Sequence, residues 1–177
     1  MSLAAAGTMT SVPMGTSQYS EVAEWLYREA LLLDRSDFLA WLSLMSQDVQ
    51  YDMPTRSSVM PKEGSGFHPE LGLFVENHAS LTARVKRLQT DQAWAEQPRS
   101  RTRHFVSNVL VDRAANGELH VTCAFLLIRL RSNRPADLFC GERQDTLRRQ
   151  DSALKLARRR ILLDQTVLES HNLSIFF

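Results

Sequence analysis

The sequence predicts an α+β fold in which N-terminal helices pack in a curved antiparallel sheet. Three observations lead to this prediction. Apolar residues recur at helical spacing over residues 20–45, they alternate with a period of two over much of residues 101–163, and Asn116-Gly117 is a strong hairpin signal. Helices followed by a long antiparallel meander are typical of α+β domains. A curved sheet wrapped around its helices would form a cone with an internal pocket.

One domain is expected, with a short tail before it. The chain has 177 residues, and its 44% of hydrophobic and 23% of charged residues are the ordinary mix of a packed domain. Residues 1–19 contain no charge and no hydrophobic period, so we expect a mobile N-terminal tail there. The single cone-shaped α+β domain is expected to comprise residues 20–177.

Apolar spacing predicts three helices. Ser20 resembles an N-cap for the first helix, and Ser36 is expected to open the second. The expected inward residues are Val22, Trp25, Leu26, Ala30 and Leu33 in the first helix and Phe38, Trp41, Leu42 and Met45 in the second. A third helix is expected over residues 74–88, with Leu81, Val85 and Leu88 directed inward.

Strands and loops account for the middle of the chain. Residues 48–54 are expected to form a short strand that Pro54 ends, followed by a Gly- and Pro-containing loop over residues 61–72. Residues 89–100 are expected to form an irregular connection. The next strand is expected to place three residues on one face: Phe105, Val109 and Val111.

The strand expected over residues 119–128 is apolar on both faces. The residues on one face are Leu119, Val121, Cys123, Phe125 and Leu127, and those on the other include Ala124, Leu126 and Ile128. Such a strand is either central or covered by another subunit. Two further strands are expected over residues 138–147 and 154–163.

The charge distribution argues against nucleic acid as a partner. Residues 1–100 hold 8 basic and 12 acidic residues, whereas residues 101–177 hold 13 and 8. The run from Arg158 to Arg160 would split between two faces of a strand, so it forms no basic stripe. No apolar run approaches the roughly 18 residues of a membrane span. We therefore expect neither nucleic-acid binding nor membrane insertion.

Cys123 and Cys140 each lie in an apolar stretch and are expected to be small buried thiols. Reduced, buried cysteines fit the cytosol, and the chain does not open with a signal-peptide pattern. We therefore expect a cytoplasmic protein.

Four stretches carry a resemblance to a known family. They are YREALLLD (27–34) with YDMPTR (51–56), WAE (94–96) with SRTRHFVSNV (100–109), GERQDTLRR (141–149), and RILLD (160–164) with NLSIFF (172–177). In this order they resemble the β subunits of bacterial aromatic-ring-hydroxylating dioxygenases of the biphenyl, benzene and naphthalene type. The resemblance covers roughly residues 20–177 and omits the tail and the 61–72 loop.

The resemblance implies a cone-shaped fold like that of nuclear transport factor two and a small structural subunit without a redox centre. It implies a heterohexamer of three such β chains and three large α subunits. The α subunit would carry a Rieske [2Fe–2S] cluster and a mononuclear non-haem iron, supplied with electrons from NADH through a reductase and usually a ferredoxin. The complete enzyme would convert an arene into a cis-dihydrodiol.

The residues of this chain do not form the ligand pattern of either iron centre. A Rieske cluster needs two Cys and two His, but His120 and Cys123 would fall on opposite faces of a strand. A mononuclear iron needs two His and a carboxylate. The histidines are widely scattered: His68, His78, His104, His120 and His171. We expect no catalytic, cofactor-binding or metal-binding residue on this chain.

His78 has two interpretations. The first is a satisfied core or interface histidine, and the second is a general base in the cone pocket. The second would make the chain a stand-alone isomerase or dehydratase acting on a small hydrophobic substrate. His104 is expected to make a structural hydrogen bond. Three acids could shape a pocket but more commonly meet arginines or water: Asp52, Asp145 and Asp164.

Arginines and the chain end are candidates for subunit contacts. The arginines could form a solvated rim or bidentate pairs with carboxylates of another subunit. They are Arg101, Arg103, Arg143, Arg148, Arg149 and Arg160. Residues 173–177 are expected to form a final strand, buried in the sheet or in a subunit contact, which adds Phe176 and Phe177 as interface candidates.

Overall fold

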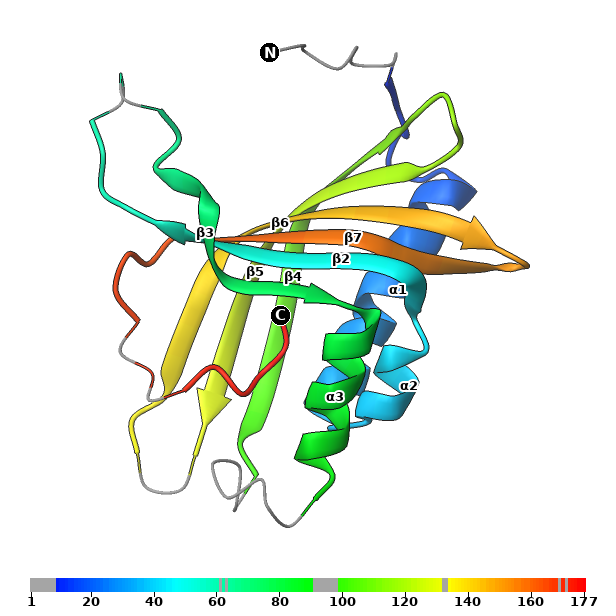
Figure 1. Cartoon of the computed structure of the whole chain (residues 1–177). Helices are drawn as coiled ribbons and strands as arrows, with labels where there is room; N and C mark the ends of the chain where they lie inside the picture. Colours follow the sequence, from blue (N-terminus) through cyan, green and yellow to red (C-terminus); the bar gives the residue numbers. More distant parts are fainter. Residues whose placement is uncertain are drawn as a thin grey trace.

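Seven strands form one sheet, and three helices pack against one of its faces. The computed structural model describes residues 9–60, 62, 64–90, 99–131, 134–168, 170 and 172–177. The elements are β1 (Thr10–Ser11), α1 (Ser17–Asp34), α2 (Phe38–Leu42), β2 (Met45–Arg56), β3 (Phe67–Asn77), α3 (His78–Leu88), β4 (Arg101–Arg113), β5 (Leu119–Leu130), β6 (Asp137–Gln150) and β7 (Ala153–Leu163). Figure 1 shows the sheet curving around the helices, with the end of the chain running back between them. The predicted α+β class is confirmed.

The strand order is β1-β4-β5-β6-β7-β2-β3. Strands β4 to β7 form the predicted antiparallel meander. Strand β2 pairs antiparallel with β3 but parallel with β7, and this contact was not predicted. The parallel pairing places β7, the last strand in the sequence, beside β2, one of the first.

Helix α1 buries the apolar face that its sequence predicts. All five expected residues are buried, and the same face also holds Glu29, which is fully buried. The indole of Trp25 donates a hydrogen bond to the main-chain oxygen of Leu154 (3.0 Å), which ties α1 to β7.

Regular structure begins earlier in the chain than predicted. Strand β1 pairs with β4, and Val12 is buried. Thr16, and not Ser20, caps α1, because its side chain accepts a hydrogen bond from the amide of Tyr19 in the first turn (3.2 Å). The predicted mobile tail is therefore wrong for residues 10–19, and residues 1–8 lie outside the described residues.

Helix α2 is shorter than predicted. Its N-cap is Asp37, whose side chain accepts a hydrogen bond from the amide of Ala40 (3.2 Å), and not Ser36. The helix ends at Leu42, so Met45 belongs to β2.

The predicted start of the third helix is wrong as well. Helix α3 begins at His78, because Asn77 and Ser80 form a reciprocal capping box. Phe74 therefore lies in β3, which also takes up the end of the predicted 61–72 loop. The predicted connection over residues 89–100 lies largely outside the described residues.

Irregularities in the strand register change two further predictions, the end of β2 and the inward face of β4. Pro54 does not end β2, which continues to Arg56 through register shifts on both sides of Pro54. In β4 the register shifts between Ser107 and Leu110. This bulge reverses the alternation, so Phe105 faces outward while Val109 and Val111 face the core. On β5, the five residues predicted for the core face are all buried: Leu119, Val121, Cys123, Phe125 and Leu127.

Candidate functional site

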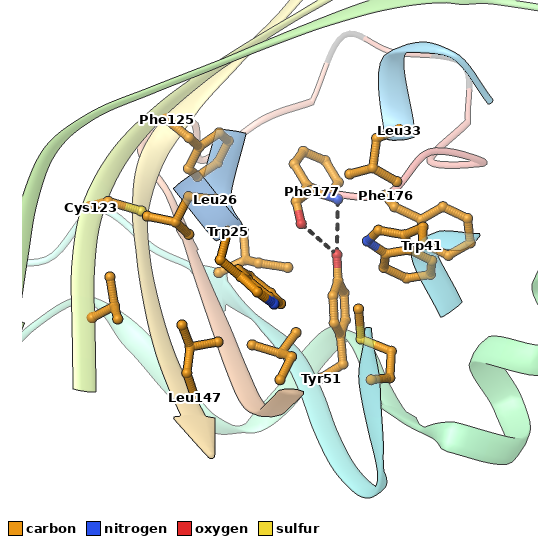
Figure 2. Packing of buried hydrophobic residues seen from close by; sticks show 14 of the residues in the cluster. Trp25, Leu26, Leu33, Trp41, Tyr51, Cys123, Phe125, Leu147, Phe176 and Phe177 are labelled. Carbon is orange, nitrogen blue, oxygen red and sulfur yellow. Dashed lines mark hydrogen bonds between the residues drawn. The ribbon is translucent and has the colours of Figure 1, made fainter. Parts of the chain in front are cut away.

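The end of the chain fills the interior of the cone. Phe176 and Phe177 are only 2% and 1% exposed, and Figure 2 shows both rings inside the apolar cluster. The hydroxyl of Tyr51 accepts a hydrogen bond from the Phe177 amide (2.9 Å) and donates one to the Phe177 main-chain oxygen (3.0 Å). The predicted burial is confirmed. The predicted final strand is wrong, because the described residues after β7 form no strand and both phenylalanines point inward.

Two arginines and two carboxylates form a buried cluster beside Phe177: Glu29, Arg143, Asp145 and Arg159, all at most 2% exposed. The guanidinium of Arg159 donates to Glu29 and Asp145 at 2.7–2.8 Å. It also donates to the main-chain oxygen of Phe177 at 2.6 Å. Arg143 lies 3.3 Å from Glu29 and 3.5 Å from Asp145. Opposite charges in equal number make burial of the cluster possible.

The cluster holds Glu29 in its charged form. Burial alone would raise the pKa of Glu29, but Arg159 and Arg143 outweigh burial and lower it. Burial alone would likewise lower the pKa of Arg159, but Asp145 and Glu29 outweigh it and raise that pKa. Glu29 is thus a partner in an ion pair and not a free general base.

Glu29→Gln is expected to change how stability depends on pH. Because the folded-state pKa of Glu29 is below its ordinary value of 4.5, its charge stabilises the fold above that pH, and this contribution is lost as pH falls through the folded-state pKa. The stability difference between wild type and Glu29→Gln should be constant near neutral pH and shrink in acid. Urea unfolding at pH 7 and at steps below pH 4.5 measures it. A difference that does not change with pH would contradict the ion pair.

Side chains from β4 and α3 hold the segment that leads to Phe177. His104 on β4 lies 2.6 Å (Nδ1) from the Asp34 carboxylate and 3.1 Å (Nε2) from the main-chain oxygen of Phe176. Arg84 on α3 donates to the main-chain oxygen of Ile175 (2.9 Å). The predicted structural hydrogen bond of His104 is therefore confirmed.

Beside Phe176 the cone interior has little room for a substrate. A cavity of about 30 Å³ remains there, lined in part by Phe38 and His104, which is room for two or three water molecules at most. A wider hollow of about 570 Å³ lies against β2, β3 and β7 and is lined in part by Asp52 and Arg160. His78 is the first residue of α3 and contacts Gln47 (3.4 Å), away from the interior. An isomerase site needs a base facing a tyrosine or a protonated acid in an open pocket. The cone interior therefore does not support the isomerase or dehydratase alternative with His78 as its base.

The other acids that could have shaped a pocket pair with arginines. Asp52 lies 3.5 Å from Arg160 and 4.0 Å from Arg158, and Asp164 lies 3.1 Å from Arg56. Partial burial raises the pKa of Asp52, and the two arginines offset this only in part. Together with Asp145 in the buried cluster, this confirms the expectation that these acids meet arginines.

The outer face of the sheet carries an apolar patch. In the strand register Phe105 is opposite Leu126, which is opposite Cys140, and in the next row Ile128 is opposite Leu138. We call these five residues the outer apolar patch. Phe105, Leu126 and Leu138 are 50%, 37% and 56% exposed, and the three described helices lie on the other face of the sheet (Figure 1). An antiparallel sheet that faces water is normally polar on that side, so the patch is a candidate contact surface.

Comparison with known proteins identifies the family. A family model of the ring hydroxylating beta subunit matches residues 28–170. The chain belongs to the family of ring-hydroxylating dioxygenase β subunits. The β subunit of biphenyl 2,3-dioxygenase from Rhodococcus jostii (strain RHA1) is 38% identical over 171 residues, covering 93% of this chain and 91% of that protein. The β subunit of chlorobenzene dioxygenase from Cupriavidus sp. (strain PS12) is 36% identical over 174 residues, with the same coverage.

Solved structures agree with this assignment to the β subunits. A chain of naphthalene 1,2-dioxygenase with indole bound in the active site is 26% identical, with a TM-score of 0.79, and the match covers 93% of this chain and 89% of that chain. ActVI-ORFA from Streptomyces coelicolor, at 20% identity and a TM-score of 0.61, shares the fold; the match covers 84% of this chain and 98% of that chain. The predicted family and the cone-shaped fold are confirmed. The chain is a small structural subunit of an oxidoreductase complex.

This β subunit does not bring its cysteines together. Cys123 faces the core, whereas Cys140 is half-buried in the outer apolar patch. Burial raises the pKa of the Cys123 thiol, which keeps it unreactive. Among the described residues, no three His, Cys, Asp or Glu side chains are grouped to hold a metal ion. No described helix has both the length and the apolar character to span a membrane.

Three interface candidates of the β subunit are wrong. Arg143, Phe176 and Phe177 are buried inside their own chain and have almost no surface to offer. Arg101 and Arg103 are exposed beside the outer apolar patch, and Arg103 lies 3.4 Å from Asp34. The others also pair within the chain: Arg148 with Asp48 and Glu118, Arg149 with Glu21, and Arg160 with Asp52. Pairing of these arginines across subunits stays a prediction.

The central members of the buried cluster were not predicted. Glu29 falls within the apolar face of α1, and Arg159 falls between Ala157 and Ile161, two buried positions on β7. A charged residue at a position where the periodic pattern expects an apolar one indicates a buried ion pair, and this criterion would have identified both residues.

Proposed function

We propose that this β subunit acts by assembly and not by catalysis. It would bind a large α subunit that carries the Rieske [2Fe–2S] cluster and the mononuclear non-haem iron. Electrons would come from NADH through a reductase and a ferredoxin, in the cytoplasm. Relatives are dioxygenase subunits named for biphenyl and chlorobenzene, so we propose a hydrophobic arene as the substrate class and a cis-dihydrodiol as the product of the complete enzyme.

The filled interior is the observation that carries this proposal. Phe176 and Phe177 fill the interior of the cone, and the acids next to them are bound by Arg159. Among the described residues, exposed apolar side chains gather in the outer apolar patch, where a partner can reach them. This arrangement suits a subunit that supports another chain.

The isolated β subunit is expected to contain no stoichiometric iron and to oxidise no arene, because no described residues are grouped as metal ligands. Metal analysis of the purified chain, and incubation with an arene, NADH and a reductase, measure both properties. One iron per chain together with a coloured cluster would overturn the proposal. So would arene turnover without an α subunit.

We further propose that the outer apolar patch is the contact between β copies in a heterohexamer of three β and three α subunits. The patch spans three adjacent strands, and contiguous exposed apolar side chains of this kind often mark a protein–protein contact. Arg101 and Arg103 lie at its β4 edge, where each could pair with a carboxylate of the next copy. A cyclic arrangement would cover the patch on every copy.

Leu126→Glu is expected to abolish self-association of the β subunit. Leu126 lies at the centre of the patch, and a carboxylate there would have to be buried without a partner. Light scattering at micromolar concentration should give a multiple of the 20.2 kDa chain mass for wild type and the single-chain mass for the variant. Leu39→Glu, on the exposed side of α2, serves as the control and should behave as wild type. A monomeric wild type would contradict the role given to the patch.

A further inference from the structure

The half of the sheet that does not carry the outer apolar patch has a hollow. The strand order places the patch on β4, β5 and β6 and the hollow on β7, β2 and β3. The hollow has a volume of about 570 Å³ and is bordered on β3 by Leu71 and Val75, which are 62% and 82% exposed. Because β3 is an edge strand, both side chains are open to a neighbouring molecule. We call the site formed by these two residues with Asp52, Arg158 and Arg160 the β3 hollow.

A ring of three β copies needs two different contact surfaces on every copy. Identical surfaces meet only about a twofold axis, whereas copies around a threefold axis join head to tail. The outer apolar patch is the first of these surfaces, and Leu71 and Val75 give the β3 hollow the apolar border that a second one requires. The sheet curves between the two sites, so they face in different directions, as closure of a ring demands (Figure 1).

The shapes of the two surfaces are complementary. Phe105 and Leu138 project from the patch and are 50% and 56% exposed. A cavity of roughly 150 Å³ accommodates a benzene ring, so a hollow of about 570 Å³ has room for the ring of Phe105 and its neighbours.

The charges at the two surfaces match as well. In the β3 hollow, Arg158 and Arg160 share Asp52 at 4.0 and 3.5 Å, longer than the roughly 2.7–2.9 Å of a direct hydrogen bond between charged groups. Glu76, the other acid there, is already paired with an arginine of α3 (2.8 Å), so the hollow has an excess of positive charge. Glu142 is exposed at the β6 border of the patch, and it accepts a hydrogen bond from a neutral amide side chain (2.8 Å), which does not offset its charge. An arginine of the hollow on the next copy would supply the missing counter-charge.

We propose that the β3 hollow of each β copy receives the outer apolar patch of the next copy, so that the copies associate head to tail. The inference rests on the proposed contact between β copies and identifies the surface on the other side of that contact. The occupant is a second copy of this chain, because the projecting apolar side chains and the free carboxylate that the hollow can accept are both present at the patch.

The test is sedimentation velocity of wild type, Val75→Glu, Leu126→Glu and an equimolar mixture of the two variants, over a concentration series from micromolar upward. Each variant loses one surface and keeps the other, so each alone should sediment as a single chain of 20.2 kDa. In the mixture, the intact patch of Val75→Glu can bind the intact hollow of Leu126→Glu. A species of two chains should therefore form, without a larger ring. It should need a higher concentration than the wild-type assembly, because a single contact lacks the reinforcement of ring closure.

Each other outcome has a distinct meaning. Val75→Glu that assembles as wild type does would overturn the inference and leave the role of the patch intact, and if this variant no longer binds the large subunit, the hollow belongs to that subunit. A mixture that stays as single chains at every concentration would also overturn the head-to-tail contact. A wild type that stays a single chain would contradict the proposed contact between β copies, and the inference with it. If circular dichroism shows that Leu126→Glu does not fold, Phe105→Glu replaces it, since Phe105 belongs to the same patch and is half exposed.

Discussion

Deletion of residues 174–177 is expected to yield aggregated or unassembled protein. The deletion removes the buried Ile175, Phe176 and Phe177 and leaves the hydroxyl of Tyr51 without its two hydrogen bonds. Truncating one buried Phe to Ala typically costs about 3–5 kcal/mol, and whole domains are stable by only about 5–15 kcal/mol. The loss of two such rings therefore approaches the entire stability of the fold.

Circular dichroism melts and size measurement of the deletion variant test this expectation. A variant with alanine at positions 175–177 keeps the main chain and so separates the contribution of the rings from that of the hydrogen bonds. Leu39→Ala is the control, because its side chain is 58% exposed on α2, outside the outer apolar patch, and its loss should change the stability and assembly of the chain little. A deletion variant that melts within a degree or two of wild type would show that the chain end is not part of the core.

Arg159→Met is expected to lower the free energy of unfolding by about 3–5 kcal/mol, the usual effect of removing one partner from a buried ion pair. The change leaves Glu29 and Asp145 facing each other, with only Arg143 to compensate at 3.3 and 3.5 Å. It also removes the donor to the main-chain oxygen of Phe177. For a domain of this size the Tm should fall by roughly 6–20 °C.

Urea unfolding of Arg159→Met and Arg158→Met gives a matched comparison between adjacent residues. Arg158 lies on the opposite face of β7 with 54% of its side chain exposed, so its replacement should change stability by less than about 1 kcal/mol. Arg159→Lys keeps the charge but loses the forked geometry of the guanidinium. Its free energy of unfolding should lie between those of Arg159→Met and Arg158→Met. Equal stability of the two methionine variants would contradict the role of the buried cluster.

The helices and the core faces were predictable where a periodic pattern continued without interruption. The apolar spacing in α1 and the alternation in β5 each predict a single buried face, and both faces are confirmed. Helix ends were harder to predict, because several residues compete as caps. Thr16 precedes Ser20 by one turn, and Asn77 with Ser80 stops the helical pattern from reaching back to Phe74.

Features that depend on contacts distant in sequence were not predictable in the same way. The bulge after Ser107 turns Phe105 outward, and a single residue of slip reverses a strand face. The buried cluster joins Glu29 to Arg159 across 130 positions. The burial of the chain end was predictable from its composition, but its course into the cone was not, because it depends on Tyr51, Arg84 and His104.

In the proposed function, this chain contributes assembly, and no iron or reacting group, to a dioxygenase. The most direct measurement is co-expression with the large Rieske subunit proposed as its partner, followed by light scattering, metal analysis, and arene turnover with NADH, reductase and ferredoxin. We predict a complex with equal numbers of the two chains, iron in proportion to the large subunit only, and turnover that is lost when this chain is omitted. The same mass, iron content and turnover from the large subunit alone would contradict an assembly role for this chain.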